Sequence, residues 1–157
     1  MTRKATKGTN FDDWAGVLET SVEDAKAAWQ ELHRRGLVSV RRGQITVSPW
    51  AMRRATSEAQ RRLAAHLSGY VLTENSFIVR RAGRPPGLPC ILNTRITVEQ
   101  IANYFRDGWG LTEIERDLGL LTRQEIEAAI QYYLNHRAEI EASRQRSREL
   151  YEAQAPQ

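Results

Sequence analysis

Residues 87–95 read GLPCILNTR and lead directly into an amphipathic segment. Pro89 fixes its own φ and lacks a backbone donor, which favours an edge strand or an extended loop over a central strand. Asn93 tolerates a left-handed backbone and is therefore suited to turning the chain. Thr97 and Gln100 have the spacing of a helix capping box. The stretch predicts a short extended segment, a turn, and a helix that begins after Thr97.

The same capping pattern recurs twice downstream, at Thr112 with Glu115 and at Thr122 with Glu125. Three helices are therefore predicted after a short strand at 77–79, and they form a second helix-turn-helix-like module. Of the neighbouring pair Tyr132-Tyr133, one ring is predicted to face the core and the other the solvent. The side chains predicted to face the core are Val98, Ile101, Tyr104, Phe105, Ile126, Ala129, Ile130, Tyr133 and Leu134.

The N-terminal part has a different order of elements. A short helix at 11–18, capped by Asn10, precedes a longer helix from Ser21 to Arg35, and two short strands at 37–40 and 44–47 follow. This order resembles a winged helix-turn-helix. Pro49 at a favoured first position and an apolar stripe then predict one continuous helix from about 49 to Gly69.

The length, charge and cysteine count of the chain limit which kinds of protein it can be. The 157 residues carry a formal net charge of +4 and one cysteine, so an intrachain disulfide and a cysteine-pair metal site are excluded. No apolar segment resembles a signal peptide or a membrane span, and we expect a cytoplasmic protein. The expected organisation is a flexible basic arm at 1–9, a winged-helix-like module at 10–68, a linker at 69–76, a helical domain at 77–138 and a charged tail at 139–157.

The C-terminal part, from about Phe77 to Ile140, resembles domain-of-unknown-function family 433, found among bacterial antitoxins of the VapB type. Two positions depart from the family pattern: Asn93 stands where glycine is usual, and 117–120 replaces a segment that usually holds a Tyr-Pro pair. The residues that carry the resemblance are Gly87, Pro89, Ile91, Thr94 to Val98, Gly108, Glu113, Ile114, Leu121, Thr122, Ala128 to Leu134, His136, Glu139 and Ile140.

The resemblance implies a mainly α, homodimeric DNA-binding regulator, often paired with a toxin of the PIN-type nuclease fold, and no enzyme. We therefore expect the antitoxin of a type II toxin–antitoxin pair that represses its own operon. A regulator without a toxin, such as a phage repressor or excision factor, is one alternative. A protein-interaction adaptor that binds no DNA is another.

Charge distinguishes the two helix-turn-helix candidates. Residues 1–68 hold twelve Lys and Arg against seven Asp and Glu, a net +5, whereas residues 98–135 hold three against seven, a net −4. Because a phosphate backbone attracts the first and repels the second, DNA is expected on the N-terminal part.

The expected contacts combine base-reading and phosphate-binding side chains. The predicted DNA-binding residues are Lys26, Gln30, His33, Arg34, Arg41, Arg42, Arg53 and Arg54, with Arg123 and Gln124 as second choice. Arg144, Arg146 and Arg148 in the tail are expected to contact an acidic protein partner.

The sequence contains no pattern that is typical of a catalytic or metal-binding site. Cys90 lies in an apolar stretch and is expected to be a buried thiol. His33, His66 and His136 share no ligand spacing with each other or with Cys90. No glycine-rich phosphate loop or Ser/His/Asp arrangement is present, so no cofactor and no enzymatic activity are expected.

Overall fold

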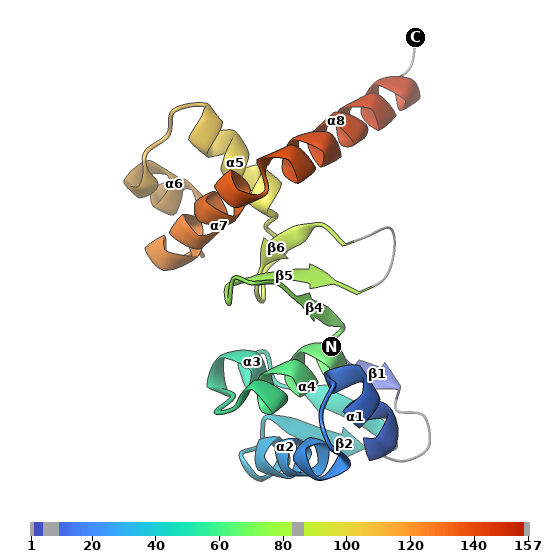
Figure 1. Cartoon of the computed structure of the whole chain (residues 1–157). Coiled ribbons are helices and arrows are strands. Elements are labelled where there is room, and N and C mark those ends of the chain that lie inside the picture. The colour runs from blue at the N-terminus through green and yellow to red at the C-terminus, as the bar shows by residue number, and fades with distance from the viewer. Residues whose placement is uncertain (1, 5–9, 83–86, 156–157) are drawn as a thin grey trace. The chain divides into compact units, whose positions relative to one another are not determined.

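The computed structural model describes residues 2–4, 10–82 and 87–155. The chain divides into two compact units, Met1–Leu72 and Thr73–Gln157, coloured blue to green and green to red in Figure 1. The boundary falls within the stretch 69–76 that was predicted as a linker, although part of that stretch is a strand. The protein is mainly α-helical, as predicted.

The first unit combines helices with a small sheet. Asn10 and Ser21 cap its first two helices by accepting from the backbone N–H groups of Asp13 and Asp24, as their positions in the sequence predict. The elements are β1 (Thr2–Lys4), α1 (Phe11–Leu18), α2 (Val22–Arg34), β2 (Val38–Arg41), β3 (Gln44–Val47), α3 (Ala51–Arg54), α4 (Glu58–Ser68) and β4 (Tyr70–Leu72).

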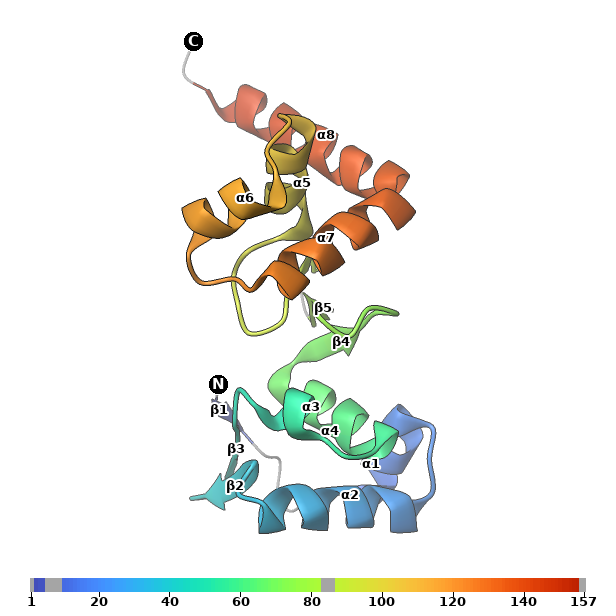
Figure 2. The same cartoon turned by 90° about the vertical axis from the view of Figure 1, so that its left-hand side faces the viewer.

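The core of the first unit lies between α1, α2 and α4, which pack against one another and are seen together in Figure 2. Leu32 of α2 and Leu63 of α4 are fully buried. The rings of Trp14 and Trp29 lie 5.3 Å apart between α1 and α2. Packing against α4 gives the helix pair α1–α2 a third helix.

The N-terminus differs from the prediction of a flexible arm at 1–9. Thr2–Lys4 form strand β1, which pairs antiparallel with β3 and gives the strand order β1-β3-β2. The hairpin strand β3 offers an open edge whose N–H and C=O groups gain from pairing. This polar stretch has no strand signal of its own, so the sequence could not predict it. The rest of the predicted arm lies outside the described residues.

The single helix predicted from 49 to 69 is wrong. The structure holds α3 and α4, separated at Ala55–Ser57, where Ala55 is extended with ψ 135°. Ser57 caps α4 by accepting from the N–H of Gln60 at 3.1 Å. The buried side chain of Gln60 in turn accepts from the backbone N–H of Thr56 at 2.9 Å. These local bonds compete with helix continuation, as serine and threonine commonly do.

The second unit begins with an antiparallel pair of strands in which Ile78 faces Ile91 and Arg80 faces Pro89. Asn93 has φ 64°, the predicted left-handed turn. Cys90 is buried, as predicted. The elements are β5 (Ile78–Arg81), β6 (Pro89–Ile91), α5 (Val98–Arg106), α6 (Leu111–Leu118), α7 (Arg123–Asn135) and α8 (Arg137–Gln154).

Two of the three predicted capping boxes are confirmed, at Thr97 with Gln100 and at Thr122 with Glu125. The third is wrong, because α6 begins two residues earlier than a Thr112 cap requires and places Thr112 inside its first turn. Gly110 takes the N-cap position, and its N–H donates to the Glu113 side chain at 3.4 Å.

The core of the second unit is a cluster formed by α5, α6, α7 and the two strands. The prediction that one of Tyr132 and Tyr133 faces solvent is wrong, since each ring is only 2% exposed. Tyr132 contacts His136 and Arg80, and Tyr133 contacts Phe105 and Glu141, so both side chains are enclosed. Phe105 and Leu134, predicted for the core, are instead largely exposed.

Helix α8 follows a break at His136, whose φ of −126° departs from helical geometry. Of its described residues only Ile140 is buried, and the rest of the helix projects from the unit (Figures 1 and 2). The charged tail predicted from residue 139 is therefore part of a helix whose first turn belongs to the core.

Candidate nucleic-acid interface

Helix α2 presents its predicted DNA-contacting side chains to solvent. Lys26, Gln30, His33 and Arg34 are all exposed, whereas the opposite side of α2, with Ala25, Ala28, Trp29 and Leu32, is buried. A period of 3.6 residues produces this separation, because the two sets occupy different sides of the helix. Helix α2 can therefore pack with one side and contact a ligand with the other.

The exposed side chains of α2 have neighbours that limit their freedom. The ammonium of Lys26 lies 5.7 Å from the centre of the Phe11 ring, and the His33 ring stacks on Trp29 at 5.9 Å. Arg34 donates to both carboxylate oxygens of Glu31, at 3.0 and 2.5 Å. These hydrogen bonds lower the pKa of Glu31 and raise that of Arg34. Arg34 would have to exchange Glu31 for a phosphate in order to bind DNA.

Arg41 and Arg42 lie exposed at the tip of the β2–β3 hairpin. Because Arg41 pairs with Gln44, the loop contains only Arg42 and Gly43, which have φ of 51° and 73°. Positive φ at both positions is the requirement of a type I′ turn, for which Asn-Gly is strongly preferred. Arginine at position 42 therefore makes the turn less stable than asparagine would. It also places a positive charge at the tip of the hairpin.

Replacing Arg42 with asparagine should therefore stabilise the protein. A left-handed conformation costs a non-glycine residue about 1–2 kcal/mol, and asparagine relieves part of that cost. We expect the free energy of unfolding in urea to rise by about 0.5–1 kcal/mol. Arg41→Asn is the matched control, since Arg41 lies in a strand, and it should give no gain. An equal gain from both variants would show that the turn geometry is not the cause.

Arg53 and Arg54 lie exposed on α3. A hydrogen bond connects the end of α3 to the residue that follows α2. The guanidinium of Arg35 donates to the carbonyl oxygen of Arg54 at 2.5 Å. Sequence reasoning missed this role of Arg35, because the bond links positions nineteen residues apart. Arginines that are distant in the sequence thus gather near the C-terminal end of α2. On α4, Arg62 instead binds Glu58 and the carbonyl oxygen of Leu18.

The candidates in the second unit have acidic neighbours. Arg123 and Gln124 are exposed at the start of α7, and Arg123 lies 3.7 Å from Glu127. On α8, Arg144 pairs with Glu141 at 3.8 Å, and Arg148 pairs with Glu152 at 3.5 Å. Arg146 forms no ion pair within the described part of the chain, so the three predicted tail arginines are not equivalent.

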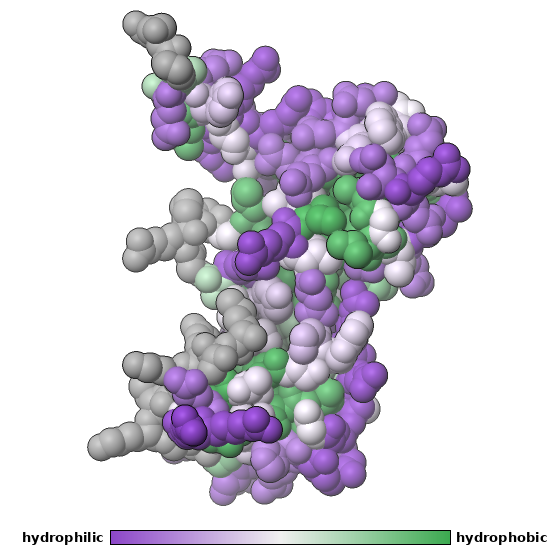
Figure 3. Space-filling model, turned by 180° about the vertical axis from the view of Figure 1, so that it is seen from behind, coloured by the Kyte–Doolittle hydropathy of each residue, from purple (hydrophilic) through white to green (hydrophobic). Residues whose placement is uncertain are grey.

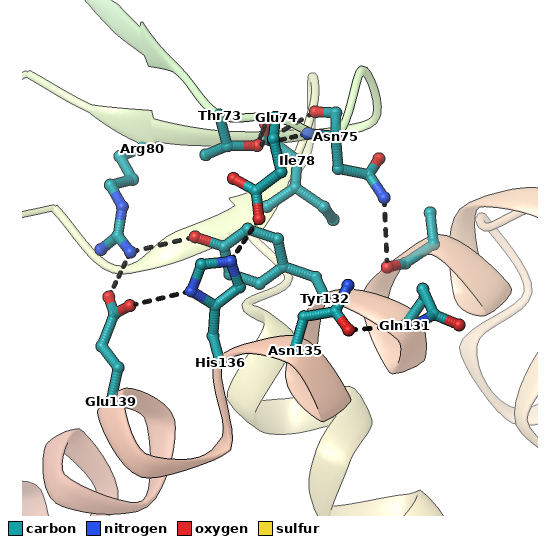
Figure 4. Close-up of polar contacts among 11 residues, drawn as sticks. Thr73, Glu74, Asn75, Ile78, Arg80, Gln131, Tyr132, Asn135, His136 and Glu139 are labelled. Carbon is teal, nitrogen blue, oxygen red and sulfur yellow. Dashed lines mark hydrogen bonds and ion pairs between the residues drawn. The ribbon is translucent and has the colours of Figure 1, made fainter.

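A polar network holds the start of α8 against the strands (Figure 4). His136 contacts the carboxylates of Glu74 and Glu139 and stacks on Tyr132 with 4.1 Å between the ring centres. Arg80 of β5 pairs with Glu139 and donates to the Tyr132 hydroxyl at 3.0 Å. Burial raises the pKa of Tyr132. The sequence gives no signal for this network, because its members come from three separated segments.

The network predicts a pH-dependent contribution to stability. The hydrogen bond to His136 lowers the pKa of Glu74 below its ordinary 4.5, so the contribution is present above that value and is lost as the pH falls. Glu74 is largely exposed, and we expect Glu74→Gln to cost only about 0.5 kcal/mol at pH 7.

In urea unfolding, the difference in free energy of unfolding between the two proteins should shrink as the pH is lowered from 7 to 3. Glu149→Gln, the same chemical change on the outer part of α8, is the control and should cost less at pH 7. A Glu74→Gln cost that persists unchanged at pH 3 would contradict the assignment.

Other kinds of site have no support in the geometry. Among the described residues, no three His, Cys, Asp or Glu side chains gather as a metal site would require. Burial raises the pKa of the Cys90 thiol, which disfavours a nucleophilic thiolate. No helix within the described ranges is long and apolar enough to cross a membrane.

Comparison with known proteins gives a match in the second unit only. No curated protein and no solved structure matches the chain. The family model described as protein of unknown function, DUF433, matches residues 78–133. The matched stretch runs from β5 to near the end of α7 and contains most of the core cluster. The second unit of this chain therefore contains a domain of the DUF433 family.

Proposed function

We propose that the protein is a DNA-binding regulator whose first unit contacts duplex DNA with α2 and the β2–β3 hairpin. The observation that carries the proposal is the exposure of Lys26, Gln30, His33 and Arg34 on a helix whose other side is buried. In helix-turn-helix proteins the second helix lies in the major groove and its outward side chains reach the base edges. Helix α2 is the second helix of such a pair.

The proposed DNA-binding side chains form two groups, one that contacts base edges and one that contacts phosphates or the minor groove. Lys26 and Gln30 are of the types that bind base edges in the major groove. Arg41 and Arg42 suit phosphate or minor-groove contacts, which position a protein on the duplex. Arg53 and Arg54, tied to the end of α2 through Arg35, would extend the phosphate contacts.

The charge distribution supports the first unit over the second. Residues 1–68 carry a net +5 and residues 98–135 a net −4, so a polyanion favours the first. We propose that the DUF433 domain instead mediates homodimerisation and protein binding. In the antitoxin version of the proposal, its partner is a PIN-type nuclease encoded by a neighbouring gene.

The test is binding of the purified protein to duplex DNA from its own promoter, across a salt series. We expect tight binding whose affinity falls steeply with salt, because neutralised phosphates release counterions. Arg123→Ala/Gln124→Ala, which changes the second helix-turn-helix candidate, should bind like the unchanged protein. Absence of specific binding would favour the adaptor alternative.

A further inference from the structure

The second unit has an open groove between the projecting part of α8 and the β5–β6 strands. Its volume is about 760 Å³. Ser143, Arg146, Ser147 and Leu150 of α8 form one wall, at the spacing of one side of a helix. Figure 3 shows the unit hollowed beneath the projecting end of α8, with apolar atoms inside the hollow.

The described residues that line the groove include three arginines, Arg81, Arg95 and Arg146, and no carboxylate. Within the described part of the chain none of the three forms an ion pair. Arg81 donates to the carbonyl oxygen of Thr94 at 3.4 Å, which leaves its charge uncompensated. Because the helices α5 to α7 of the same unit are acidic, this concentration of positive charge is local to the groove.

The base of the groove is firmly held. Ile140 is buried in the core of the unit, and Glu139 pairs with Arg80 of β5. Glu99 and Glu139 line a smaller adjoining hollow of about 180 Å³, which shares Leu88, Thr97, Ser143 and Arg146 with the groove. The first turn of α8 is therefore fixed against the strands beside the groove. A site held in this way loses less entropy when it binds.

The lining favours a peptide over a nucleic-acid backbone. Leu88 and Leu150 border the groove and are 44% and 64% exposed. Exposed apolar side chains among polar ones are typical of protein-binding surfaces, where an apolar anchor carries much of the affinity. A phosphate backbone gains nothing from leucine, whereas carboxylates form strong charge-assisted bonds with arginine.

We propose that this groove binds an acidic segment of a partner protein. One apolar side chain of the segment packs on Leu88 and Leu150, and flanking carboxylates bind Arg95 and Arg146. The hydroxyl groups of Ser143 and Ser147 add hydrogen-bond donors along the α8 wall. The inference concerns the second unit and does not rest on DNA binding by the first.

The experiment is a selection of random peptides on the immobilised full-length protein. Selected sequences should be enriched in Asp and Glu around a Leu, Ile or Phe. One selected peptide is then synthesised with a fluorescent label, and its binding to the protein is measured by fluorescence anisotropy. Arg95→Glu/Arg146→Glu should weaken its binding about tenfold or more. Arg116→Glu is the control, since it makes the same change at an exposed arginine of α6 outside the groove lining, and should leave the affinity within about twofold.

Two further measurements make the outcome decisive. The thermal melting temperature of the double variant should stay close to that of the unchanged protein, because neither arginine has a structural ion pair. Its affinity for promoter DNA should also be unchanged. Peptides without acidic residues, equal selection by the double variant, or weakened DNA binding in that variant would overturn the inference. Loss of DNA binding by Arg41→Ala/Arg42→Ala alone tests the proposed function separately.

Discussion

Replacing Arg41 and Arg42 together with alanine should weaken promoter binding roughly 30-fold at physiological salt. Each neutralised phosphate contributes about −0.9 to the slope of log affinity against log salt. At about 0.15 M salt that corresponds to roughly 1 kcal/mol per contact, so the two contacts together account for about 2 kcal/mol. The salt slope of the double variant should be smaller by about 1.8.

The design separates a phosphate contact from a folding defect. Both side chains are exposed at the hairpin tip, and alanine at these positions removes no buried group. Titration by fluorescence anisotropy at four salt concentrations gives the slope, and circular dichroism checks that the fold is retained. The matched control is Lys26→Ala, which should reduce discrimination between promoter and unrelated DNA more than it changes the slope. An unchanged slope in the Arg41/Arg42 variant would remove the hairpin from the interface.

Leu32→Ala should be the most destabilising single substitution that we predict, at about 2–5 kcal/mol. Leu32 is fully buried on α2, and the removed atoms leave a cavity in the core between α1, α2 and α4. We expect a lower urea midpoint and a loss of amide protection against hydrogen exchange in residues 10–72.

Val17→Ala is the control for this prediction. Val17 lies on α1 in the same unit but is 58% exposed, so its truncation should cost less than about 0.5 kcal/mol. Similar costs for the two variants would show that the core between α1, α2 and α4 does not stabilise the unit as described. Because Leu32 faces away from the proposed DNA surface, the residual folded protein should still bind DNA.

Local signals in the sequence predicted the elements of the fold well. Ser21, Thr97 and Thr122 each cap the helix that follows them, because a cap depends on bonds within four residues. Asn93 adopts the expected left-handed turn for the same reason. On α2 the buried side chains are Ala25, Ala28, Trp29 and Leu32, which lie at the spacing of one side of a helix.

Sequence reasoning missed one feature that depends on local bonds, because the Gln60 side chain ends α3 before α4 by bonds to Thr56 that a hydrophobic stripe does not reveal. Other missed features depend on contacts between distant residues. Tyr132 is buried because α8 and Arg80 enclose it. The groove beside α8 needs residues from β6, the following turn and a helix more than forty residues later. Charge counts suggested the proposed DNA-binding surface, but only the structure shows that Arg34 pairs with Glu31.

The two separate cores have a consequence for how such a protein can change over generations. Each unit has its own set of buried hydrophobic side chains, so a substitution in the core of one unit leaves the core of the other intact. Under the proposed division of function, mutations that alter the choice of operator and mutations that alter the choice of protein partner fall in different parts of the gene. A lineage with this division of function can acquire a new promoter while it keeps its partner, or the reverse.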